Sequence, residues 1–184
     1  MNPNRQLSHN IIKKMQIQPF KYFVIHCTAT REGQKVTPDQ VRQWHTSPPP
    51  AGRGWSRVGY SDMIMLDGKR HRFVEHNGDL WIQGNEITNG VKGINSFSRH
   101  VVYVGGLDSN GDPANTMTVD QAKTLASIIK SVLAYAPDVL IAGHNQFDNK
   151  ACPSFWVPEF LQSIAIPPRN IYKNDPFGYG NKMF

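Results

Sequence analysis

The sequence lacks the features that mark exported and membrane-spanning proteins. Its basic N-terminal stretch offers only the pair Ile11 and Ile12 before Lys13 interrupts, which is too short for the apolar core of a secretory signal. No apolar run reaches the length that crosses a bilayer. We therefore expect synthesis in the cytoplasm without a signal peptide, and no membrane as a partner.

Cysteine is scarce, since Cys27 and Cys152 are the only two among 184 residues. A protein without an export signal usually keeps its thiols reduced, so both sulfur atoms are available to bind a metal. A structural disulfide between the two is the alternative. Thiol titration of denatured, unreduced protein distinguishes these two states.

Internal repeats, low-complexity segments and long runs of one charge are also missing. The length of 184 residues and the hydrophobic content of 39% suit one domain. The net charge of +6 is scattered along the chain, which favours an anionic polymer as partner. Residues 1–19 are polar and residues 167–184 are rich in Pro, Gly and Asn, so we interpret both as tails on a domain at 20–166.

Strand and helix patterns alternate along this domain. Residues 21–27 (KYFVIHC) are apolar at both alternating sets of positions, as in a strand buried on both faces and central in a sheet. The other expected elements are a helix from the Thr37 N-cap to near His45, a hairpin around Asp67-Gly68, a strand at 101–106, a helix from Thr118 to about Tyr135, a strand at 139–143 and a short helix after Pro158. The sequence therefore predicts a single α/β domain with a central mixed β-sheet flanked by helices.

Residues that bind metals follow two of the predicted strands. His26 lies at the carboxyl end of the first strand and His144 directly follows the strand at 139–143. If these strands are parallel neighbours, both imidazoles reach one edge of the sheet, and Cys152 can return to the same point. Two His and one Cys form a ligand set that zinc prefers, and three protein ligands with an open position for water are typical of catalytic zinc. We therefore predict one zinc ion in a groove at the strand ends.

Two further residues suit hydrolysis at such a site. Lys150 can place its ammonium beside an oxyanion, and Tyr60 can donate a proton or a hydrogen bond. Each residue taken alone has an ordinary structural interpretation: a hydrogen-bonded His, a solvated Lys or a packed Tyr. Cys27 should face away from His26 as a buried thiol. We expect ordinary structural roles for the four histidines without a pairing pattern, which are His45, His71, His76 and His100.

Several segments resemble, in order, the motifs of one enzyme family. They are FVIHCTAT (23–30), VRQWH (41–45), GWSRVGYSDMIMLDG (54–68), VYVGGLD (102–108) and HNQFDNKACPSF (144–155). They are similar to the zinc-dependent N-acetylmuramoyl-L-alanine amidases, a group that includes amidase-type phage lysozymes and peptidoglycan recognition proteins. The resemblance implies metal ligands at His26, His144 and Cys152, catalytic roles for Tyr60 and Lys150, and substrate binding by Trp55 and Asn95.

The chain departs from the family pattern at a few positions. Many members have His directly after the tyrosine, where this chain has Ser61, and Asn89, Gly90 and Val91 differ from the phage enzyme. Arg99 and His100 stand where small residues usually precede the VGG strand. We expect these changes on the groove wall.

The resemblance implies hydrolysis of the amide between N-acetylmuramic acid and L-alanine of bacterial peptidoglycan, with no nucleic acid partner. A phage or prophage endolysin, which reaches the cell wall after release or assisted export, fits this activity. The alternative is a non-catalytic regulator of the same fold that binds peptidoglycan or, by family analogy, RNA polymerase. Binding families of this fold often lack the cysteine ligand, so Cys152 favours catalysis.

Overall fold

A five-stranded mixed sheet forms the centre of the computed structural model, which describes residues 17–182. The strand order is β5-β4-β7-β2-β9, and every neighbouring pair is parallel except β4 and β5. The strands are β2 (Tyr22–Cys27), β4 (Asp62–Ile64), β5 (Arg70–Arg72), β7 (Ser98–Tyr103) and β9 (Leu140–Gly143). The predicted α/β fold with a mixed sheet is confirmed.

In the part of the chain that the structure describes, two short strand pairs and seven helical segments complete the fold. β1 (Gln18–Pro19) pairs with β6 (Trp81–Ile82), and β3 (Thr30–Arg31) pairs with β8 (Gly106–Leu107). The α-helices are α2 (Pro38–Thr46), α3 (Val119–Tyr135) and α4 (Val157–Ser163); the 3-10 helices are η1 (Asn95–Phe97), η2 (His144–Gln146), η3 (Pro168–Asn170) and η4 (Tyr179–Asn181). Both predicted capping boxes are present, at Thr37 before α2 and Thr118 before α3. Within residues 17–182, none of the helices has the length and apolar character to cross a bilayer.

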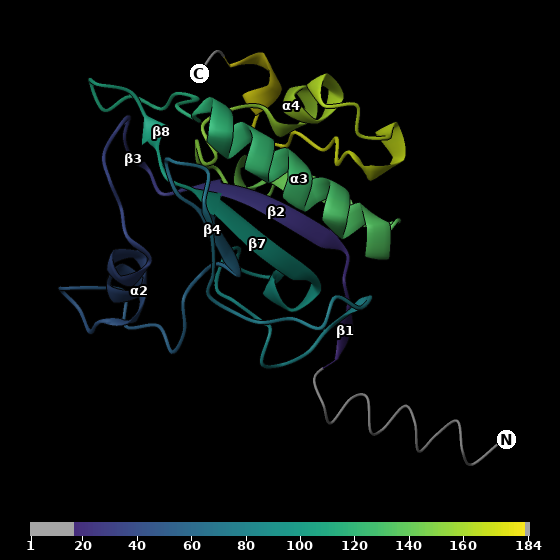
Figure 1. The fold of residues 1–184 in the computed structure, drawn as a ribbon, viewed down its shortest axis with the longest axis horizontal. Helices are drawn as coiled ribbons and strands as arrows, with labels where there is room; N and C mark the ends of the chain where they lie inside the picture. Colours follow the sequence, from purple (N-terminus) through teal and green to yellow (C-terminus); the bar gives the residue numbers. More distant parts are fainter. Residues whose placement is uncertain (1–16, 183–184) are drawn as a thin grey trace, which may run out of the picture.

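The sheet buries its two faces in separate apolar clusters. Alternation along β2 sends Phe23 and Ile25 to one face, where they pack with apolar residues of α3 and α4. The opposite face carries the smaller cluster, in which Met63 and Val102 pack with Val41 of α2. Figure 1 shows α3 and α4 together on one side of the sheet and α2 on the other. His26 therefore belongs to the α2 side.

Strand β7 begins three residues earlier than the predicted strand at 101–106. Its first residues, Ser98, Arg99 and His100, are polar and fully buried, so no apolar pattern marks them. The Arg99 guanidinium pairs with Glu86 at 3.2 Å and donates to the Tyr135 hydroxyl at 2.9 Å. The prediction that Arg99 and His100 lie on a groove wall is wrong, because partners from distant segments hold both side chains inside the protein.

The segment after residue 166 is packed onto the domain, which differs from the predicted tail. Ile171 forms a parallel bridge with Ile141, and the Tyr172 amide donates to the Ile141 carbonyl at 3.0 Å. The Asn170 side chain donates to the carbonyls of Pro137 and Val139 at 2.7 and 3.0 Å. This segment covers the outer edge of β9, where backbone amides and carbonyls would otherwise be left unpaired.

The N-terminal segment also differs in part from the prediction. Residues 18 and 19, predicted within the tail at 1–19, form β1 and pair with β6. Residues 1–16 and 183–184 lie outside the described residues.

We predict that Asn170→Ala lowers the free energy of unfolding by about 2 kcal/mol, because two buried carbonyls lose their donor. Urea denaturation followed by circular dichroism measures this change. Asn181→Ala, at an exposed position of the same segment, is the matched control and should stay within about 0.5 kcal/mol of the unmodified protein. Equal stability of the two variants would mean that the segment is a detachable tail.

Candidate metal centre and active site

Strand register brings the two predicted histidine ligands together. β2 and β9 are parallel neighbours, and Ile25 of β2 lies opposite Gly143, the last residue of β9. His144 follows at once and is therefore level with His26 at the carboxyl edge of the sheet. The two imidazole centroids are 4.7 Å apart.

The loop after β9 returns Cys152 to the same edge. The Asn145 amide donates to the Cys152 carbonyl at 2.7 Å, which closes the loop between them. The Cys27 amide donates to the Cys152 sulfur at 3.3 Å, and such a bond favours a thiolate. Both cysteines are free, and Cys27 is a buried thiol as predicted.

The ligand atoms of His26, His144 and Cys152 all lie within 4.8 Å of one another. The Cys152 sulfur is 3.7 Å from Nδ1 of His26. Tetrahedral coordination with Zn–S near 2.3 Å and Zn–N near 2.1 Å places sulfur and nitrogen roughly 3.6 Å apart. The three residues therefore form a site that fits a metal ion of this kind.

Burial sets the protonation of the three groups. It lowers the pKa of His26 well below the ordinary value, and burial together with nearby Lys150 lowers the pKa of His144 to about 4. Both imidazoles are neutral at neutral pH, as metal ligands must be. Burial raises the pKa of the Cys152 thiol, so its proton must leave when a metal binds.

Tyr60 lies beside the metal ligands. Its ring centroid is 5.1 Å from that of His26 and 5.2 Å from that of His45. The His45 imidazole accepts a hydrogen bond from the Gly59 amide at 3.1 Å, which fixes the backbone next to Tyr60. Burial raises the pKa of the Tyr60 phenol, so this group keeps its proton.

Lys150 reaches the site through an ion pair that the sequence did not reveal. Its ammonium is 2.8 Å from the Asp148 carboxylate, and the same carboxylate oxygen lies 3.8 Å from Nε2 of His144. The Lys150 side chain is 57% exposed, so it can reorient in solvent.

The two residues predicted to bind substrate lie in different places. The Trp55 ring stacks on the His45 ring, with their centroids 4.9 Å apart. The His45 ring in turn contacts Tyr60, so it lies between Trp55 and Tyr60 in this chain of contacts. Asn95 lies in η1, before the amino end of β7, and its side-chain oxygen accepts from the Val91 amide at 2.7 Å. The structure does not bring Asn95 to the metal ligands, and its role stays a prediction.

Two histidines that were expected to have ordinary roles lie in or beside the site. The His45 ring contacts the Tyr60 ring. Nδ1 of His100 lies 3.0 Å from Nε2 of His26. His100 lies next to His26 because β2 pairs with β7. The sequence alone does not reveal this pairing or its register, so the contact could not be predicted.

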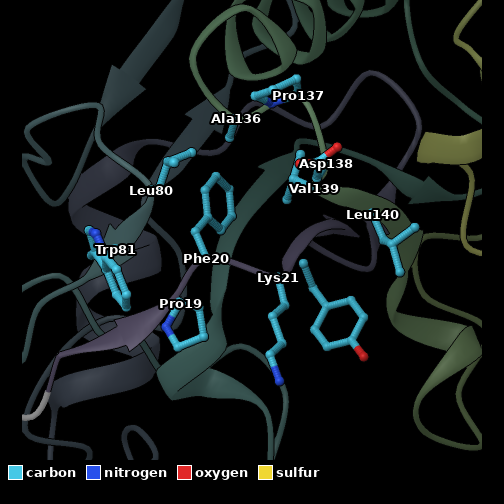
Figure 2. A pocket seen from close by; sticks show the side chains of 11 residues that line it. Pro19, Phe20, Lys21, Leu80, Trp81, Ala136, Pro137, Asp138, Val139 and Leu140 are labelled. Atoms are coloured by element: carbon cyan, nitrogen blue, oxygen red, sulfur yellow. The ribbon is translucent and has the colours of Figure 1, made fainter.

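An apolar hollow of about 440 Å³ lies at the other end of the sheet. Figure 2 shows Phe20, Leu80 and Trp81 around it, with the connection from α3 to β9 on the far side. It contains none of the predicted site residues.

The family described as N-acetylmuramoyl-L-alanine amidase matches residues 16–155. The chain belongs to this family. It is 35% identical to the endolysin of Enterobacteria phage K11 over 146 residues, which are 79% of this chain and 88% of that protein. The family resemblance and the enzyme class predicted from the sequence are confirmed.

Solved structures share the fold of this amidase. The N-acetylmuramoyl-L-alanine amidase LysC from Clostridium intestinale aligns with a TM-score of 0.62 and 20% identity, covering 83% of this chain and 89% of that one. Peptidoglycan recognition protein-LE in complex with tracheal cytotoxin, a monomeric diaminopimelic acid-type peptidoglycan, also aligns with a TM-score of 0.62. Its identity is 17%, and the alignment covers 85% of this chain and 84% of that one.

We predict that zinc binding at pH 6 releases about one proton, which comes from the Cys152 thiol. Imidazoles with an ordinary pKa near 6.5 would release about 1.5 further protons at this pH, but both ligand imidazoles are already neutral. Calorimetry in buffers of different ionisation enthalpy counts the protons. Cys27→Ala should release the same number, whereas a count of two or more in the unmodified amidase would contradict the neutral state of His26 and His144.

Proposed function

We propose that this amidase is a zinc-dependent peptidoglycan hydrolase of the endolysin type. It cleaves the amide between N-acetylmuramic acid and the L-alanine of the stem peptide. The observation that carries this proposal is the cluster of His26, His144 and Cys152, in which both histidines are buried and Cys152 is partly buried. Among the described residues, the cluster supplies three ligands, which is the number typical of catalytic zinc, whereas structural zinc usually has four.

The residues around the cluster suit amide hydrolysis. When bound, zinc supplies Lewis-acid chemistry, since it polarises a carbonyl and lowers the pKa of a bound water. His26, His144 and Cys152 would hold it. Tyr60 keeps its proton, so its hydroxyl can donate a hydrogen bond to the oxygen that gains negative charge as the amide is attacked.

Lys150 would complement Tyr60 as a cation. Its ion pair with Asp148 lies at the protein surface, where such pairs contribute about 1 kcal/mol or less. The ammonium can therefore exchange this carboxylate for a substrate oxyanion at little cost. Asp148 keeps Lys150 close to the metal ligands until substrate arrives.

Peptidoglycan as substrate is supported by charge and by the fold neighbour bound to a peptidoglycan fragment. The net charge of +6 favours association with an anionic wall. Trp55, stacked on His45 next to Tyr60, offers an aromatic surface for the glycan or the stem peptide. The Arg53 guanidinium lies 5.2 Å from the Trp55 ring centroid. A regulator that binds RNA polymerase rests on family analogy alone.

We predict that the zinc-loaded amidase releases peptides with a new L-alanine amino terminus from purified sacculi. Amino-terminal labelling and mass spectrometry detect this product, and chelation should abolish it until zinc is restored. Cys152→Ala should lose both metal and activity, because the site then lacks its thiolate. Cys27→Ala is the matched control, since its thiol is not one of the three ligands of the cluster. A Cys152→Ala protein with undiminished hydrolysis would refute the zinc mechanism.

We predict that Tyr60→Phe lowers kcat by about 10²- to 10³-fold, because one donor to the developing oxyanion is lost. The zinc content should not change, since Tyr60 is not a ligand. Steady-state kinetics on soluble muropeptides and metal analysis of the same sample test both statements. Val58→Ala, at a buried position two residues away, controls for general loosening of the segment. A rise in KM with unchanged kcat would instead assign Tyr60 to substrate binding.

A further inference from the structure

The two ring nitrogens of His26 have different neighbours. Nδ1 faces the metal cluster, at 3.7 Å from the Cys152 sulfur. Nε2 lies 3.0 Å from Nδ1 of His100, which is within hydrogen-bond distance. One nitrogen is therefore available to a metal and the other is committed to His100.

The sheet fixes His100 in this position. Val24 of β2 lies opposite His100 of β7, so His26, two residues further along β2, is its diagonal neighbour on the same face. The backbone amide and the hydroxyl of Ser61 both donate to the His100 carbonyl, at 2.8 and 2.7 Å. These contacts hold the His100 backbone against the residue that directly precedes β4, the strand next to β7.

The loop before β7 seals the imidazole from solvent. His100 has 0% exposure. Gly90 lies directly over its ring, and a Cβ at that position would overlap the ring atoms. His100 thus has little freedom to leave His26, and water does not compete for the bond between them.

We propose that His100 is a positioning residue that fixes the tautomer and orientation of His26 for metal binding. The inference rests on the proposed zinc site. A neutral imidazole that binds a metal through Nδ1 must carry its proton on Nε2. His26 then donates to Nδ1 of His100, which acts as the acceptor, and such outer partners orient metal ligands and raise their basicity.

The proton positions follow from this assignment. With Nδ1 of His100 as acceptor, the proton of the neutral His100 ring lies on its Nε2. This atom has no hydrogen-bond partner within residues 17–182. The opposite arrangement, with His100 as donor, would put the His26 proton on Nδ1 and block the ligand atom.

Zinc affinity of purified protein tests the proposal. His100→Phe keeps an aromatic ring under Gly90 but removes the acceptor, and should weaken zinc binding about 10- to 100-fold in competition with a chromophoric chelator. His100→Asn places an amide oxygen near the position of Nδ1 and should restore most of this loss. His71→Phe, the same change at a histidine of the edge strand β5, is the matched control and should bind zinc as the unmodified amidase does.

Several results would overturn the proposal. Equal zinc affinity of His100→Phe and the unmodified amidase would show that the acceptor has no effect. Equally weak binding by His100→Phe and His100→Asn would show that ring shape matters and the acceptor does not. If the unmodified amidase binds no zinc, the proposed function fails first and this inference fails with it.

The tautomer can be read without any variant, which matters if His100→Phe does not fold. Long-range ¹⁵N–¹H correlation spectra of the metal-free amidase should show His26 protonated at Nε2 and His100 protonated at its own Nε2. A His26 ring protonated at Nδ1 would refute the assignment.

Discussion

The parallel register between β2 and β9 is the constraint on which the site depends. It sets Ile25 opposite Gly143, so the residues that follow, His26 and His144, meet at the carboxyl edge of the sheet. A shift by one residue would turn one imidazole to the opposite face, where α3 packs, and no metal cluster would form. The apolar residues of β2, buried on both faces, make such a shift unfavourable because each face has its own packed cluster.

The same burial that holds the ligands also prepares them. Neutral imidazoles are far less costly to bury than charged ones, so desolvation and metal binding favour the same protonation state for His26 and His144. Cys152 is the exception, since burial favours the thiol and the metal needs the thiolate. The Cys27 amide, which donates to this sulfur, partly offsets that conflict. Cys152 is therefore the ligand whose state depends most on the metal.

The sequence predicted those parts of the site that depend on local pattern. His26, His144 and Cys152 were found because each follows a recognisable strand or its loop, and the capping boxes at Thr37 and Thr118 fixed the helix starts. The polar start of β7 could not be predicted in this way. Arg99 is stable inside the protein because partners from other segments, Glu86 and Tyr135 among them, meet it there. His100 contacts His26 because β7 lies beside β2. Such pairs, distant in sequence, appear only when the topology is known.

The segment after residue 166 holds the loop from His144 to Cys152 at its start and, through Tyr179 and Asn149, near its tip. Gln146 is buried and donates to the carbonyls of Tyr172 and Asn174, while Phe147 stacks on Tyr172 at 4.9 Å. These contacts tie the start of the loop to the edge of the domain, so the metal ligands at both loop ends stay in place. Lys150, near the tip, is held mainly by an exposed ion pair that a substrate anion can replace. The C-terminal segment thus holds the start of this loop and leaves exposed the Lys150 ammonium, which we propose binds the substrate oxyanion.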